Sequence, residues 1–230
     1  MTLVWVVALG VVAGLAVLGL VVLAVAWLRI RQQSWRVRAW AARQGWSYRP
    51  TDPDLADRWP DLPLMAVSGH ARDVVDGQVD QVRFRGFVLV PGRAGHPGDT
   101  LRHVLGTGVV VVATPAVIPR VTLEPVGFVD ALGWDDETVV SLGRADVDAA
   151  WRIHGDPATA RALLDDAVVA WLLDPAHRGS YGFDQGELVG WAVDRIVPAE
   201  LAGWVTQLTD LLALIPPQVW RGPDDSFWAD

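Results

Sequence analysis

The residues best suited to acid–base chemistry lie close together, between residues 146 and 156. Asp146 and Asp148 precede a predicted strand that carries His154, and Asp156 follows it. A carboxylate pair near an imidazole is the minimum set for general acid–base catalysis. Asp146, Asp148 and His154 are therefore the candidate catalytic residues of a hydrolase. Asp156 has a structural explanation as well, because Asp156-Pro157 is typical of a helix N-cap followed by proline at the first helical position.

The composition excludes several other chemistries. All 19 basic residues are arginine and the chain contains no cysteine, so there is no Schiff-base lysine, phosphate-loop lysine, thiolate nucleophile or sulfur-ligated metal. The scattered histidines lack zinc spacing, and prolines interrupt the acids of residues 52–61 in a pattern that fits no calcium loop. We therefore expect neither a metal nor a cofactor.

An uncharged apolar run from Leu3 to Leu28 lies ahead of these residues. About 20 apolar residues of helix span a bilayer core, and Trp5 and Trp27 are spaced as interfacial aromatic residues would be. A cleavable signal peptide is the alternative, with Ala24-Val25-Ala26 as the cleavage site. However, the run exceeds the usual 7–15 residues and no basic segment precedes it. We expect a transmembrane anchor over residues 1–28.

Arginines begin immediately after this run, in a basic juxtamembrane helix expected over residues 29–45 and ended by Gly45. Positive charge after the span and none before it predicts a cell-membrane, single-pass protein whose C-terminal domain is cytoplasmic. The bilayer is thus the expected partner. Anionic headgroups are a further candidate partner, because juxtamembrane arginines attract them. The expected lipid-facing residues are Arg29, Arg31, Trp35, Arg36, Arg38 and Trp40.

The span contains a G-x-x-x-G pair, Gly10 and Gly14, at which two helices can approach closely. This pair makes a homodimer through the span a further hypothesis. The formal net charge is −8, yet residues 29–49 hold six arginines and no acid, so the domain itself is strongly acidic. An acidic domain argues against nucleic acid as a partner.

Beyond the helix, residues 46–220 are expected to form one α+β globular domain, followed by a disordered acidic tail at 221–230. Alternating segments around Asp76-Gly77 predict a hairpin with its turn at that dipeptide. A second hairpin is expected at 180–193, and further strands at 108–114, 119–124, 138–142 and 149–154. One helix is predicted from Pro157 to Leu172 and another from Pro198 to Ile215, each with one apolar face. Hairpin-joined strands with such helices predict a mainly antiparallel sheet with helices packed on one face.

Three pieces of the sequence resemble a family of actinobacterial single-span membrane proteins, and a broader bacterial domain of unknown function. One is the anchor with its arginines and the segment Gly45-Trp46-Ser47-Tyr48-Arg49-Pro50. The others are Asp148 to Pro157 with Leu163-Leu164, and Ile215-Pro216 with Val219-Trp220. The resemblance implies this architecture and location, and it implies no reaction.

Two functions follow as hypotheses. The first is a non-enzymatic, membrane-anchored cytoplasmic domain that binds a protein partner or lipid headgroups. The alternative is a membrane-tethered hydrolase that uses the Asp/His chemistry described above. Convergence of Asp146, Asp148 and His154 in a pocket would favour the hydrolase, and an apolar groove without such groups would favour the binding module.

Overall fold

A computed structural model describes Val17, Gly19, Val21 and residues 32, 34–55, 57–60, 62, 69–91, 106–126, 139–177, 179–192 and 198–220. It contains an N-terminal helix at residues 34–43 and eight strands. The strands are β1 (Ser47–Asp52), β2 (Gly69–Val79), β3 (Val82–Pro91), β4 (Thr107–Ala113), β5 (Val121–Pro125), β6 (Trp151–Gly155), β7 (Ser180–Asp184) and β8 (Glu187–Ala192). The other helices are α3 (Ala145–Ala150), α4 (Pro157–Leu163), α5 (Asp166–Leu173), α6 (Pro198–Leu214) and the 3-10 helix η4 (Pro217–Trp220).

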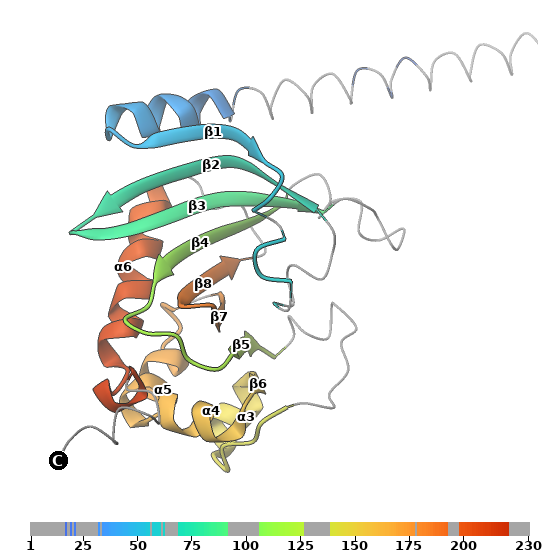
Figure 1. The fold of residues 1–230 in the computed structure, drawn as a ribbon. Coiled ribbons are helices and arrows are strands. Elements are labelled where there is room, and N and C mark those ends of the chain that lie inside the picture. Colours follow the sequence, from blue (N-terminus) through green and yellow to red (C-terminus); the bar gives the residue numbers. More distant parts are fainter. Residues whose placement is uncertain are drawn as a thin grey trace, which may run out of the picture.

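The strands form one sheet in the order β1-β2-β3-β4-β8-β7-β5-β6, and every neighbouring pair is antiparallel. Figure 1 shows α6 running along the sheet, with α3, α4 and α5 gathered at the β6 end and the N-terminal helix next to β1. The predicted α+β class with a mainly antiparallel sheet is confirmed.

Each face of the sheet has its own core. The first contains Val75, Phe84, Leu123 and Phe183 from the sheet, packed against the buried sides of the helices, including Ala41, Leu163 and Leu208. The second lies on the opposite face, where Leu55, Trp59 and Leu62 cover Phe87, Val109, Val189 and Trp191. In the part of the chain that the structure describes, helices contribute to the first core alone, and the segment 53–62, here called the strap, covers the second.

The first hairpin turns at a different place from the one predicted. The strands continue through Asp76-Gly77 and pair up to Val79 and Val82, so that Asp80 and Gln81 form the turn. Both turn residues have positive φ, 46° and 71°, as a two-residue type I′ turn requires. Gly77 has a different role, because a Cβ there would lie 2.6 Å from the Trp46 ring. Packing against Trp46 therefore accounts for this glycine.

The predicted helix from Pro157 to Leu172 is divided into α4 and α5. Asp156 caps α4, and Asp165 caps α5 by accepting hydrogen bonds from the amides of Ala167 and Val168. Residues 145–150, in part predicted as strand, form α3. The strand predicted at 138–142 is not formed among the described residues. Val139 makes one isolated β-bridge there, with His154. The second hairpin and the buried face of α6 are confirmed.

Most of the predicted transmembrane segment, including Gly10 and Gly14, lies outside the described residues. Within the residues that are described, no helix has the length and apolar character needed to cross a bilayer. The anchor therefore stays a prediction from the sequence.

Candidate functional site

The N-terminal helix docks on the domain through one side. Ala41 is fully buried, and Val37 and Trp40 are partly buried against the first core. The helix ends at Gly45, whose φ is 73°, and the amide of Trp46 donates to the carbonyl of Ala41 at 2.9 Å. This C-terminal cap reverses the chain into β1. The spacing of Val37, Trp40 and Ala41 places them on one helical face.

Aromatic rings hold the helix in place. Trp40 packs edge-on against Trp46 with ring centroids 4.7 Å apart, and Trp46 packs in the same way against Phe84 at 4.8 Å. Edge-to-face pairs of this kind contribute about 0.5–1.5 kcal/mol beyond their burial. The contacts fix the orientation of the helix relative to β2 and β3.

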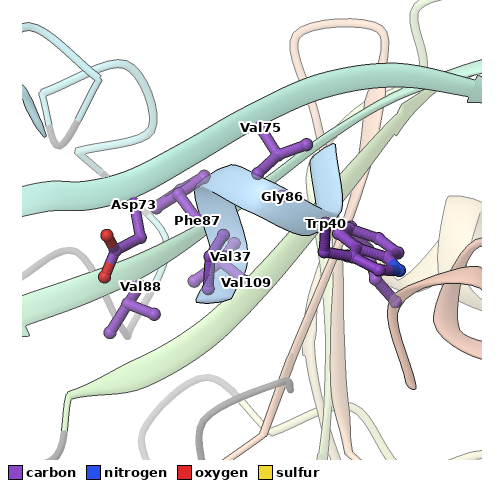
Figure 2. A pocket seen from close by; sticks show the side chains of 9 residues that line it. Val37, Trp40, Asp73, Val75, Gly86, Phe87, Val88 and Val109 are labelled. Atoms are coloured by element: carbon purple, nitrogen blue, oxygen red, sulfur yellow. The ribbon is translucent and has the colours of Figure 1, made fainter. Parts of the chain in front are cut away.

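A small cleft lies under the helix (Figure 2). The residues that line it come from the helix, from β2, β3 and β4, and from the start of α6: Val37, Trp40, Asp73, Val75, Gly86, Phe87, Val88, Val109 and Leu201. The space open to a water-sized sphere is about 30 Å³. That volume suits water or a methyl-sized group, since one water needs about 10–15 Å³ on this measure.

One end of the cleft is charged. Figure 2 shows Asp73 next to Val88, away from Trp40. Tyr48 Oη donates to Asp73 Oδ1 at 2.8 Å, and Arg72 Nε lies 3.4 Å from Asp73 Oδ2. Asp73 is buried and has a φ of 55°, within an irregularity of the β2–β3 register. A non-glycine residue with positive φ in a β-bulge is strained, and such strain is concentrated at functional sites.

The same cluster reaches the N-terminal helix. Burial and the hydrogen bond to Asp73 raise the pKa of Tyr48, whereas a hydrogen bond with Ser34 and the charge of Arg38 act to lower it. Ser34 and Arg38 therefore lie close to the phenol. The start of the helix is thus joined to the charged end of the cleft.

The opposite side of the helix faces solvent. Trp35 is 66% exposed, and Arg36 and Arg38 are exposed as well. Among the predicted lipid-facing residues, Arg29 and Arg31 lie outside the described residues. Trp40 lies on the side that faces the domain, where it packs against Trp46. We therefore leave Trp40 out of the lipid-facing set that we propose below.

The candidate catalytic carboxylates have structural partners. Asp148 accepts hydrogen bonds from Ser141 Oγ at 2.7 Å and from the Leu142 amide at 3.0 Å, and these interactions lower its pKa. Asp146 is exposed and lies 3.6 Å from Arg144. His154 lies on β6, opposite Thr122. The two carboxylates thus stabilise the segment before α3 and the start of that helix.

The structure contains a buried carboxylate that no sequence motif indicates. Glu124 on β5 is fully buried, and neither of its carboxylate oxygens has a hydrogen-bond partner. Burial raises its pKa to about 7. Val121 and Leu123 on the same strand point into the first core. Because side chains alternate along a strand, the Glu124 side chain points to the strap-covered face. Polar and apolar residues alternate along β5 in the sequence, but such alternation does not show whether the polar face is exposed to solvent or covered.

A more open hollow of about 280 Å³ lies between the ends of β5, α3 and α5. Trp151 and Leu172 are among its lining residues, as is His177, whose ring stacks on Trp171 at 4.0 Å. No group of three or more metal-ligating side chains occurs among the described residues. We take the cleft under the N-terminal helix as the candidate site, because it combines an apolar wall, charged groups and a link to the predicted membrane-proximal segment.

These features define the chain as an α+β domain whose sheet is covered on one face by helices and on the other by a strap. The fold is similar to one solved structure, that of the mycobacterial trehalose monomycolate transport factor A, TtfA. The two share 19% sequence identity with a TM-score of 0.56, over 81% of this chain and 97% of that one. No protein-family model and no curated protein sequence matches the chain.

Proposed function

We propose that this chain is a single-pass membrane protein whose cytoplasmic domain is a lipid-interaction module. The anchor is the apolar run from Leu3 to Leu28, and the arginines after it give the orientation. The short sequence separation supports close contact with the bilayer, because only five residues lie between Leu28 and Ser34, where the continuous described helix begins.

The observation that carries this proposal is that one side of the N-terminal helix packs against the domain while the other side is exposed to solvent. Val37, Trp40 and Ala41 dock on the domain. Trp35 and Arg36 are exposed on the other side, and Arg38 is exposed at the edge of the docked side, near Tyr48. Tryptophan is favoured at the level of lipid headgroups, and each arginine near an anionic surface contributes about 1 kcal/mol. A docked helix of this kind would hold the domain against the membrane surface.

The name of the structural neighbour supports the same class of ligand. That protein is described as a transport factor for trehalose monomycolate, a mycolate lipid. A domain of this fold in a lipid pathway is in line with lipid interaction here. Neither homodimerisation through Gly10 and Gly14 nor a protein partner is needed for this proposal, and both stay separate hypotheses. The hydrolase is not favoured, since Asp146 and Asp148 have structural partners.

The absence of cysteine allows a direct test, because a single introduced cysteine can be labelled uniquely. The full chain carrying Ala39→Cys, at an exposed position of the N-terminal helix, is labelled with a fluorophore and placed in nanodiscs. We expect a headgroup-attached quencher to quench this label in discs that contain phosphatidylglycerol. Quenching should decrease with salt, since surface charge is screened within about 8–10 Å.

Val117→Cys is the matched control, because Val117 is 75% exposed in the connection between β4 and β5. Its label should be quenched much less. Equal quenching of the two labels, or none at Ala39 in anionic discs, would contradict the proposal. Replacement of Arg36 and Arg38 by glutamine should weaken the quenching at Ala39 without unfolding the domain.

A further inference from the structure

The open hollow between the ends of β5, α3 and α5 has room for a small ligand. Its volume is about 280 Å³, close to the range of about 300–1,000 Å³ that is usual for small-molecule pockets. Pro125, Ala150, Trp151 and Leu172 form apolar walls, so the hollow can take a ring or a short alkyl chain. It lies at the β6 edge of the sheet, whereas the N-terminal helix packs next to β1 at the other edge (Figure 1). A ligand therefore enters the hollow from water.

A short turn forms the polar side of the hollow. It consists of residues 174–177, directly after α5, and the amide of His177 donates to the carbonyl of Asp174 at 3.0 Å. Asp174 Oδ1 accepts a hydrogen bond of 2.8 Å from the Ala176 amide. The Asp174 side chain lines the hollow, and its Oδ2 makes no hydrogen bond with any residue that the structure describes. This oxygen is therefore available to a ligand.

His177 is held in one orientation and one tautomer. Its ring stacks on Trp171, with centroids 4.0 Å apart and 12° between the ring planes. Nδ1 lies 2.8 Å from the Trp171 carbonyl oxygen, which can only accept, so Nδ1 carries the proton and Nε2 of the neutral ring has a free lone pair. Nε2 is open to solvent and has no hydrogen-bond partner among the described residues. His177 thus presents to the hollow its unstacked face and the edge that carries Nε2.

These groups accept hydrogen bonds and favour a positive charge. The C-terminal end of a helix carries roughly half a unit of negative charge, and α5 has no basic residue in its last turn. Asp174 adds a full negative charge, and no arginine is among the described residues that line the hollow. Arg178 lies outside the described residues. The ligand that matches both the apolar walls and the acceptors is an apolar group that bears an ammonium.

We propose that this hollow is a binding site for a small amphipathic amine, with a ring or short alkyl chain and a primary ammonium. The apolar part packs against Trp151 and Leu172. The ammonium donates to Asp174 Oδ2 and His177 Nε2 at the C-terminal end of α5. This site is separate from the lipid contact proposed above, because it lies at the opposite edge of the sheet and uses none of the same residues.

The test measures the binding of three probes with the same ring by fluorine NMR. The probes are para-fluorophenethylamine, para-fluorophenethyl alcohol and para-fluorophenylpropionate. The full chain is held in phosphatidylcholine nanodiscs at about pH 8, where a primary amine is still protonated, and empty nanodiscs correct for partition into lipid. We expect the amine to bind at least about fivefold more tightly than the alcohol, and the propionate to bind more weakly than both.

Two substitutions remove one acceptor each. Asp174→Asn keeps the acceptor for the Ala176 amide but removes the charge, and it should weaken amine binding at least about threefold. His177→Asn can still donate to the Trp171 carbonyl but lacks Nε2, and it should weaken amine binding by a similar factor. Asp166→Asn is the control, because it removes the same charge from a side chain that is 99% exposed at the other end of α5. It should leave amine binding within twofold.

A third substitution tests the location. Ala150→Leu, at the end of α3, fills part of the hollow and should weaken the binding of amine and alcohol alike. Thermal melts report folding, and if His177→Asn does not melt cooperatively, Asp174→Asn and Ala150→Leu decide. The inference is overturned if the amine binds no more tightly than the alcohol, or if folded Asp174→Asn or Ala150→Leu binds it as the wild type does. Arg178→Gln removes a positive charge nearby, so weaker amine binding in this variant would also contradict an ammonium ligand.

Discussion

Trp59 Nε1 donates a hydrogen bond of 3.0 Å to Glu187 Oε2, across 128 residues of sequence. Arg58 binds both oxygens of the same carboxylate, at 3.1 and 2.8 Å. Trp59 is fully buried and stacks on Phe87 with ring centroids 6.2 Å apart. Glu187 therefore joins the strap to the start of β8 and satisfies a buried indole N–H.

Glu187→Ala should lower the free energy of unfolding by about 2–3 kcal/mol. Most of the loss comes from the buried indole N–H left without an acceptor, and the partly exposed ion pair adds at most about 1 kcal/mol. Glu187→Gln keeps an acceptor and should cost less. Urea denaturation measures each variant. Gln185→Ala, which removes an exposed hydrogen bond to the Arg58 carbonyl, is the control and should stay within about 0.5 kcal/mol. Similar values for Glu187→Ala and the control would contradict this role.

Glu124 predicts a pH dependence of stability. Its pKa is about 7 in the folded protein and 4.5 for the free side chain. The folded state thus holds the proton more tightly, so stability is highest below pH 4.5 and decreases as pH rises toward 7 and above. The decrease from this one group is at most about 3 kcal/mol. Unfolding free energies of wild type and Glu124→Gln, measured from pH 5 to 8.5, should converge at low pH and diverge at high pH, with the variant more stable. Parallel curves would show that Glu124 does not bind the proton.

A substitution in the β2–β3 turn should stabilise the folded protein. Asp80 and Gln81 both adopt positive φ, which costs about 1 kcal/mol or more in a non-glycine residue. Gln81→Gly should therefore raise the free energy of unfolding by about 1 kcal/mol, as the Asp-Gly pair suits a type I′ turn. Gln78→Gly, within β2, should instead destabilise the protein. Thermal melts separate the two variants, and a lower melting temperature for Gln81→Gly would show that the turn lies elsewhere.

Leu208 tests the packing of α6 on the sheet. It is fully buried, and a Cβ on Gly190 of β8 would lie 2.8 Å from its Cδ2. Leu208→Ala should cost about 2–5 kcal/mol in urea denaturation, and Leu164→Ala a comparable amount. Leu173 is 37% exposed, so Leu173→Ala should cost clearly less. Equal effects at Leu208 and Leu173 would contradict the assignment of the core.

Topology is tested in cells that express the full chain. Five arginines follow the apolar run within 15 residues and none precedes it, so the domain should be cytoplasmic. Protease added to intact cells should leave the domain uncut, and the same protease should cut it once the membrane is permeabilised. Cleavage from outside, or a mature N-terminus at Trp27, would contradict the predicted anchor and its orientation.

The sequence by itself determined those features that depend on local pattern. Three such features are the apolar face of α6, the β7–β8 hairpin and the end of the N-terminal helix at Gly45. They follow from apolar periodicity and from residues with special backbone preferences. The antiparallel α+β class follows from the order of these elements. Such signals come from residues that are close together in the sequence, and the structure agrees with them.

Only the tertiary structure decided which element covers which face. Periodicity shows that Trp40 prefers an apolar neighbour, but not whether that neighbour is lipid or Trp46. It places Glu124 on the polar side of β5, but the sheet is covered on both faces, so this carboxylate is buried. The sequence pattern predicts a turn at Asp76-Gly77. In the structure Gly77 lies within β2, where the Trp46 ring leaves no room for a Cβ. In each case the deciding contact comes from a segment distant in sequence, and no local pattern carries that information.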